Sequence, residues 1–360
     1  MKVGYAVLYE DGKLVISKNH ILLQKKIIKD YGEFEDTSVP WKNKSSQIKR
    51  VQILDQVKSN CMKAWFENCM NLLTLIDFEN LDVSNCIDFS YMFYNCESLQ
   101  DLNGLQNWKV SNGTDFNSMF ASCESLQDLN GLQNWNVSNG TDFNSMFASC
   151  ESLQDLKGLQ NLDLSNGTDF SYMFGYCQSL QNLNGLQTWK VSNGTDFNSM
   201  FESCQSLQNL NGLQNWNVSN GTDFSGMFSY CKSLHDLNEL QNWNVSNGKD
   251  FSSMFYSCQL LQDLNGLQNW NVSNGTDFSS MFGYCKSLQN INELQTWNVS
   301  NGTDFSYMFS YCESLKEISL LNTLDILSED MFNNCSPILK IHWKNHIYTY
   351  EDLLEYEKIC

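Results

Sequence analysis

The sequence predicts an α/β repeat fold. We expect a right-handed solenoid with short parallel strands and one short helix in each coil, and a β-rich N-terminal cap. The first observation is that ten cysteines recur every 27 residues, from Cys69 to Cys312. The second is that a unit of 27 residues cannot bury its own apolar side chains, so neighbouring copies must stack. Hydrophobic residues make up 42% of the 360-residue chain, enough for a continuous core.

Apolar residues keep fixed places in each copy, counted from its cysteine as position 1. Leucine or isoleucine fills positions 4, 7 and 10, and tryptophan fills position 13 in seven copies. Phenylalanine, methionine and phenylalanine fill positions 21, 24 and 25. Eight copies between Cys96 and Tyr311 keep this pattern closely. We therefore expect ladders of Leu, Trp, Phe, Met and Cys side chains along the interior.

The end of each copy has a helical period. Phe143, Met146, Phe147 and Cys150 stand at i, i+3, i+4 and i+7, which predicts one face of a short helix. The preceding Asn-Gly pair indicates a turn, and Asp142 suits the helix N-cap. The stretches SLQDLNGL and WNV are predicted to be short extended segments.

The two ends of the chain depart from the repeat and predict three parts. Residues 1–61 form the β-rich N-terminal cap, in which YAVLYEDGKLVIS is a hairpin turning at Asp11-Gly12 and QIKRVQIL is a further strand. Residues 62–335 form the solenoid of about ten repeats. Residues 336–360 form a C-terminal cap of one or two strands followed by a short helix.

The repeat CESLQDLNGLQNWNVSNGTDFNSMF resembles those of BspA-type leucine-rich-repeat surface proteins, of the kind found in Mycoplasma and Bacteroides. The lead-in GYAVLYEDGKLVIS and the stretch AWFENC match the same family. The resemblance implies a leucine-rich-repeat-like solenoid. It also implies a non-enzymatic adhesin that binds a protein or host-surface ligand, at the cell surface or outside the cell. No signal peptide or anchor stands out, so a cytoplasmic leucine-rich-repeat scaffold or effector is the alternative.

Composition narrows the function further. The formal net charge of -19 argues against nucleic acid, which requires clustered Lys and Arg. No apolar stretch has the length of a membrane-spanning helix, so we expect no direct membrane insertion. The four histidines are scattered and no phosphate loop or nucleophile motif stands out, so we expect no enzyme and no cofactor.

Three groups of residues are candidates for metal binding or disulfide formation. The cysteine ladder is interpreted as buried free thiols, with a disulfide ladder as the alternative. His342 and His346, with Cys335 and Cys360, suggest a metal cluster, but flanking a strand end is the simpler interpretation, and we expect no metal. The column of aspartates fits helix capping, with calcium binding as the alternative. Its members are Asp88, Asp115, Asp142, Asp169, Asp196, Asp223, Asp250, Asp277 and Asp304.

Positions 2, 6, 14, 22, 23, 26 and 27 vary between copies and are expected to face solvent. Tyrosine recurs at positions 23 and 27, and its ring offers contact area at a low entropy cost. Exposed tyrosines without a role are the alternative. The predicted contact ridge consists of Tyr91, Tyr172, Tyr176, Tyr230, Tyr284, Tyr307 and Tyr311.

Overall fold

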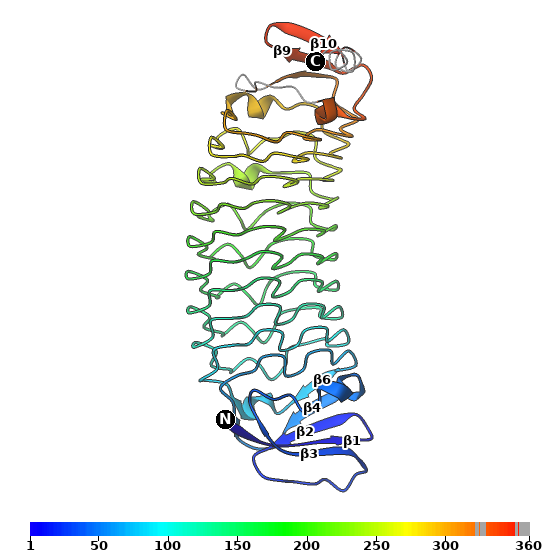
Figure 1. The fold of residues 1–360 in the computed structure, drawn as a ribbon, viewed down its shortest axis with the longest axis vertical. Helices are drawn as coiled ribbons and strands as arrows, with labels where there is room; N and C mark the ends of the chain where they lie inside the picture. Colours follow the sequence, from blue (N-terminus) through cyan, green and yellow to red (C-terminus); the bar gives the residue numbers. More distant parts are fainter. Residues whose placement is uncertain (321–323, 325–328, 350–351, 353–360) are drawn as a thin grey trace. The chain divides into compact units, whose positions relative to one another are not determined.

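The computed structural model describes residues 1–320, 324, 329–349 and 352. The chain forms two compact units, Met1–Asp169 with Asn184–Lys190, and Phe170–Leu183 with Val191–Cys360. Within each unit the repeats follow one another as stacked coils (Figure 1), so the predicted repeat solenoid is confirmed. The described residues contain no helix with the length and apolar character needed to cross a bilayer.

The first unit begins with a five-stranded sheet in the order β3-β1-β2-β4-β6 (Figure 1). β1 and β2 pair antiparallel across the Asp11-Gly12 turn, so the predicted hairpin is confirmed. β4 confirms the further strand, and it pairs parallel with β2 and with β6 of the first coil. The bounds are β1 Lys2–Tyr9, β2 Lys13–Ser17, β3 Ile27–Glu35, β4 Arg50–Ile53, β5 Val57–Lys58, β6 Thr74–Ile76 and β7 Leu81–Asp82.

Two buried tryptophans join this sheet to the coils. The Trp41 indole donates to the carbonyl of Trp65 at 2.6 Å, and the Trp65 indole donates to the carbonyl of Asp36 at 3.1 Å. Both side chains are fully buried, and their ring centroids lie 5.9 Å apart. The sheet therefore covers the apolar end of the first coil, which would otherwise face water.

The interior of the coils consists of the predicted ladders. The rings of Phe116 and Phe143 stack with centroids 5.5 Å apart, and those of Trp108 and Trp135 with centroids 6.3 Å apart. The Trp135 indole also donates to the carbonyl of Leu105 in the preceding coil at 2.9 Å. Equivalent phenylalanine stacks at 5.6 to 5.7 Å recur in the second unit. Such contacts add about 0.5–1.5 kcal/mol per pair to the burial of apolar area.

The predicted helix in each coil is wrong. In residues 116–123 alternate amides leave the coil, and that of Phe120 donates to the carbonyl of Met146 in the next coil at 2.9 Å. The amides of Met119, Ala121 and Cys123, between them, donate to carbonyls three residues earlier. Ser118 and Ser122 adopt φ values of 52° and 59°. An α-helix would bond its amides within the segment, four residues back, so bonding between coils replaces it.

Short 3-10 helices are the helical elements among the described residues, apart from the single helical residue Asp352. They are η1 Lys42–Gln47, η2 Phe78–Asn80, η3 Asn238–Leu240, η4 Asn292–Thr296 and η5 Glu329–Phe332.

The predicted parallel strands are also wrong for most coils. Equivalent aspartates, such as Asp115 and Asp142, form single parallel bridges instead. True strands occupy the extended segments only in the first and last described coils, where β6, β7 and β8 pair with strands outside the repeat. Gly131 explains part of the difference, because its φ of 113° interrupts an extended run. The handedness of the solenoid stays a prediction.

The second unit ends in a three-stranded sheet in the order β10-β9-β8, which confirms the predicted C-terminal strands. β9 and β10 form an antiparallel hairpin, and β9 pairs parallel with β8. The short helix predicted after them lies almost entirely outside the described residues. The bounds are β8 Glu317–Ser319, β9 Lys340–Trp343 and β10 His346–Thr349.

Candidate binding surface on the turn segments

The turn segments that replace the helices place the seven predicted tyrosines in an unusual backbone conformation. All seven have φ between 54° and 64°. L-residues rarely adopt this left-handed region, and bulky ones least of all. Serine fills the same repeat positions at Ser118 and Ser122, so the coil itself does not require a large ring there. Large side chains on strained backbone are typical of functional sites.

Four tyrosines of the second unit form a continuous group, here named the tyrosine column: Tyr230, Tyr256, Tyr284 and Tyr311. The ring centroids of Tyr230 and Tyr256 lie 5.2 Å apart, and those of Tyr256 and Tyr284 lie 5.3 Å apart. Tyr284 and Tyr311 stack at 4.1 Å. Three members were predicted from the sequence. Tyr256 was missed because it stands at position 26, one place before the other three.

Three other predicted tyrosines have different surroundings. Tyr176 donates a hydrogen bond from its hydroxyl to the Glu202 carboxylate at 3.2 Å. Tyr307 is 43% exposed. Tyr91 belongs to the first unit, where it contacts Tyr94 edge-on with centroids 5.7 Å apart. The predicted contact ridge as a whole stays a prediction.

The hydroxyls of Tyr256 and Tyr284 stay protonated at neutral pH. Burial and then the neighbouring Tyr230 and Tyr284 raise the pKa of Tyr256 to about 12. The hydrogen bond with Tyr311, followed by burial, raises the pKa of Tyr284. Both of these phenols can therefore donate as well as accept a hydrogen bond.

A hollow of 510 Å³, here named the serine trough, lies beside Tyr230 and Tyr256. Its floor includes Ser199, Gly226 and Ser253, which hold position 23 in three consecutive coils. Tyr172 holds the same position in the coil before them and ends the row. Gly226 leaves a gap there, where Tyr172 and Tyr307 carry rings.

Two serines that line the trough are largely buried as residues, but their hydroxyl oxygens stay accessible to solvent. Ser199 and Ser229 are each 4% exposed. Neither hydroxyl has a hydrogen-bond partner among the described residues. The floor backbone is already bonded, since the Gly226 amide donates to the carbonyl of Ser252 at 2.8 Å. The trough thus offers side-chain hydroxyls and rings, with Glu202 as its charged member.

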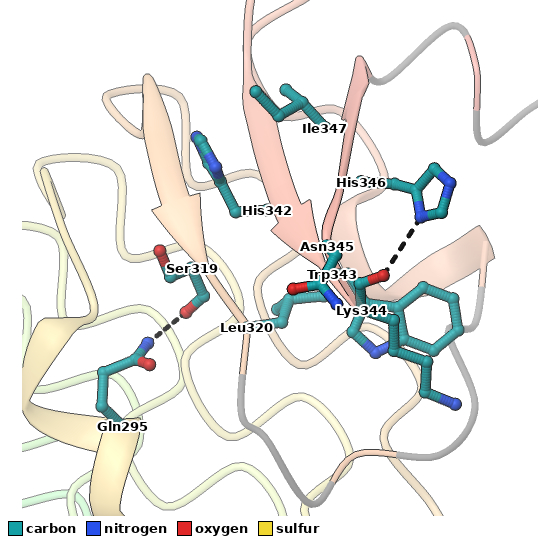
Figure 2. A pocket seen from close by; sticks show the side chains of 9 residues that line it. All are labelled: Gln295, Ser319, Leu320, His342, Trp343, Lys344, Asn345, His346 and Ile347. Atoms are coloured by element: carbon teal, nitrogen blue, oxygen red, sulfur yellow. Dashed lines mark hydrogen bonds between the residues drawn. The ribbon is translucent and has the colours of Figure 1, made fainter.

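A second hollow of 680 Å³ lies at the β9–β10 hairpin (Figure 2). The hairpin turns at Lys344 and Asn345, which both have positive φ. Figure 2 shows the rings of His342 and His346 pointing away from each other. His342 is bonded to Glu317 through Nε2 at 2.8 Å, and His346 Nδ1 lies 3.1 Å from the carbonyl of Lys344. The two histidines proposed for a metal cluster are therefore not brought together, and Cys360 lies outside the described residues.

The aspartate ladder caps turns rather than helices. Asp115 accepts the amide hydrogen of Asn117 at 3.0 Å, and this contact recurs along both units. Burial raises the pKa of Asp115, Asp142 and Asp250, as does repulsion from neighbouring aspartates. Within the described ranges no group of three or more His, Cys, Asp or Glu side chains has the arrangement of a metal site.

The cysteine ladder is buried, as predicted. Thirteen cysteines are described as free thiols, and twelve of them are buried. Cys123 donates a weak hydrogen bond from Sγ to the carbonyl of Phe93 at 3.3 Å. Burial raises the pKa of Cys123 and of Cys285 to about 12, so both stay protonated and unreactive.

Comparison with known proteins gives one family and several structures. The model of the family described as "Mycoplasma protein of unknown function, DUF285" matches residues 60–184, 154–264 and 235–343. The search of curated proteins gave no match.

Three solved bacterial structures are similar to this chain. A leucine rich cell surface protein from Faecalibacterium prausnitzii A2-165 is 16% identical, covers 96% of this chain and 95% of its own, and has a TM-score of 0.39. A leucine-rich repeat protein from Bacteroides ovatus ATCC 8483 is 14% identical, with coverages of 95% and 89% and a TM-score of 0.45. One from Eubacterium ventriosum ATCC 27560 is 15% identical, with coverages of 95% and 96% and a TM-score of 0.39.

Proposed function

Because the chain belongs to the family described as "Mycoplasma protein of unknown function, DUF285", we propose that it is a non-enzymatic binding protein. It acts as an adhesin or host-interaction protein at the bacterial surface, and its partner is a protein or another host-surface ligand. The proposal keeps the three-part organisation of cap, solenoid and C-terminal cap at 1–61, 62–335 and 336–360. The name of the Faecalibacterium protein places that protein at a cell surface and is consistent with this location.

The single observation that carries the proposal is the tyrosine column. Tyr230 and Tyr284 bear large rings at positions where the backbone conformation is strained and where other coils have serine. Packing does not require these rings, since Tyr230 is 39% exposed. Tyrosine favours interfaces because it combines a large apolar ring with a hydroxyl. The rings are therefore best explained as contact residues.

The repeated coils supply the mechanism. Weak contacts made by neighbouring coils act together, because binding at one coil raises the effective concentration of ligand at the next. The net charge of -19 disfavours anionic partners and leaves neutral or basic ones.

Free buried thiols favour a second candidate, a scaffold inside the cell. Thiols persist in reducing compartments, and twelve buried cysteines without disulfides suit such a location. Protease treatment of intact source bacteria distinguishes the two candidates. The adhesin is cleaved from outside, whereas the scaffold is cleaved only after lysis.

The contact residues are tested with purified protein on host cells. The triple variant Tyr230→Ser, Tyr256→Ser, Tyr284→Ser places at each position a residue that other coils already carry, so the fold is kept. We expect a loss of cell binding of about tenfold or more. The matched control is Tyr91→Ser in the first unit, which should bind like the unmodified protein. Equal binding by the triple variant and the unmodified protein would refute the role of the column.

A further inference from the structure

We propose that the serine trough binds a neutral oligosaccharide. This inference rests on the proposed function and names the chemistry of the partner at the same surface. A sugar presents hydroxyls that donate and accept hydrogen bonds around its edge, and apolar C–H groups on the faces of its ring. The trough presents the complement of both, because hydroxyls line its floor and tyrosine rings stand beside it.

The serine hydroxyls provide the polar side of the trough. Ser199 and Ser229 are each 96% buried, line the trough, and lack a partner within the described part of the chain. Their hydroxyl oxygens stay accessible to solvent, so they are free to bond to a ligand that enters the trough. Serine can donate and accept at once, as a sugar hydroxyl can, so each pair satisfies both groups.

The rings provide the apolar side. Tyr230 and Tyr256 line the trough, and their ring centroids are 5.2 Å apart in an edge-on pair. Tyr172 lies at the end of the position-23 row. The Tyr256 phenol stays neutral, because the pKa of this group is raised to about 12, and so it can donate to a sugar oxygen.

A peptide strand fits the trough less well. Adding a strand requires free backbone amides and carbonyls along an edge. The floor amides of Ser199, Gly226 and Ser253 instead donate to carbonyls of the next coil at 2.8 Å. The lining is also mostly hydroxyl-bearing, so it lacks the apolar pockets that anchor peptide side chains.

The charge and the repeat of the trough favour a neutral, chain-like sugar. Glu202 is the charged residue in its lining, and it repels anionic ligands. Backbone amides in this unit bond to the next coil at 2.6 to 2.9 Å, so successive coils lie roughly 4.8 Å apart, as paired strands do. Extended pyranose chains advance by roughly one ring over such a distance. A polyproline helix takes about 9.3 Å per three-residue turn and does not match one coil.

The test is isothermal titration calorimetry of the full-length chain. The probes are cellotetraose, chitotetraose, maltotetraose and lacto-N-tetraose, with a sialylated tetrasaccharide as the charged comparison. We expect at least one neutral probe to bind and the sialylated probe to bind more weakly. Failure of all four neutral probes to bind would overturn the proposal.

Gly226→Tyr is the decisive variant, because it fills the trough. Tyr172 and Tyr307 carry this side chain at the same repeat position with similar φ, so the coil accepts it. The Ser199 hydroxyl is the one atom close to the added Cβ, at 2.8 Å, and it lies on the trough floor. We expect affinity for the neutral probe to fall by about tenfold or more. Ser118→Tyr adds the same ring at the same repeat position in the first unit and should leave affinity unchanged.

A second variant tests the hydroxyls without adding bulk. Ser229→Ala copies Ala121 and Ala148, which hold position 26 in other coils, so it keeps the fold. We expect a loss of affinity of about threefold to tenfold. Unchanged affinity in both Gly226→Tyr and Ser229→Ala would overturn the site.

Host-cell binding separates this inference from the proposed function. If Gly226→Tyr loses the oligosaccharide but adheres to cells like the unmodified protein, the trough is not the adhesive site, and the adhesin proposal stands without it. If the unmodified protein binds the oligosaccharide but never adheres to cells, the adhesin proposal fails and the trough remains a sugar site.

Discussion

The coils of the first unit and those of the second share an interior but differ at the surface. Residues 96–122 and 123–149 differ only at Lys109 and Asn136, and both carry Ser, Ala and Ser at positions 23, 26 and 27. The corresponding places in the second unit hold glycine, serine and tyrosine in changing order, and glutamate once, at Glu202. The phenylalanine and cysteine ladders continue unchanged inside both. The interior therefore maintains the coil, while the turn positions are free to vary.

The strongest test of a shared interior is removal of one ring from each unit. Phe120→Ala in the first unit and Phe228→Ala in the second delete fully buried rings at the same repeat position. Each ring stacks on two neighbours at 5.5 to 5.7 Å. We expect each variant to lower the free energy of unfolding by about 3–5 kcal/mol in urea denaturation. A loss in one unit several times that in the other would contradict the shared interior.

The rate at which the ladder cysteines react with a thiol reagent also tests whether the two units share the same interior. Burial raises the pKa of Cys123 in the first unit and of Cys285 in the second to about 12, so neither forms a thiolate at neutral pH. We expect neither to react with a maleimide in the folded protein, whereas the partly exposed Cys61 reacts. Mass spectrometry after labelling locates the modified residues. The control in urea should label all 14 cysteines. Labelling of one ladder cysteine before Cys61 would show that its unit opens.

The inward-facing residues of both units were predictable, but the backbone that carries them was not. The spacing of Phe143, Met146, Phe147 and Cys150 correctly placed all four inside. A chain that turns every four residues, with left-handed Ser145 and Ser149, produces the same spacing as a helix. Periodicity alone cannot separate the two, because the difference lies in amides that bond to the next coil.

The surface was predicted less completely than the interior. Tyr230, Tyr284 and Tyr311 were found because they share position 27, and Tyr256 was missed at position 26. No sequence motif predicts the serine trough, because the trough results from Gly226 lying where other coils have side chains. The repeat sequence alone was enough to predict the family, because the family match confirms the resemblance to BspA-type repeats.

The aspartate ladder predicts a weaker effect, on the dependence of stability on pH. Burial, followed by neighbouring aspartates, raises the pKa of Asp142 and Asp250 above the ordinary 3.8. A group with a raised pKa contributes stability that is fully present below 3.8 and is lost as the pH rises through its folded-state value. Asparagine keeps the acceptor for the turn amide and removes this titration.

Asp142→Asn and Asp250→Asn should therefore melt at a higher temperature than the unmodified chain at pH 7. The gain should shrink as the pH falls toward about 3, where the aspartates are protonated. Thermal melts across this range measure it in one variant from each unit. A gain that grows on acidification would contradict the assigned direction of the pKa shift.

The smallest effect on stability should come from the residues that differ most between the units. Tyr284→Asn replaces a ring at a φ of 59° by a residue that tolerates the left-handed region. The relief of strain offsets the lost stacking on Tyr311, which is worth about 0.5–1.5 kcal/mol. We expect the free energy of unfolding to change by less than about 1 kcal/mol while host-cell binding weakens. Tyr91→Asn in the first unit should match it in stability and keep binding. If the column served packing, the result would be the reverse: the free energy of unfolding would fall by several kcal/mol and host-cell binding would stay unchanged. Removing a packing residue weakens the fold, whereas removing a contact residue weakens only the binding of the partner.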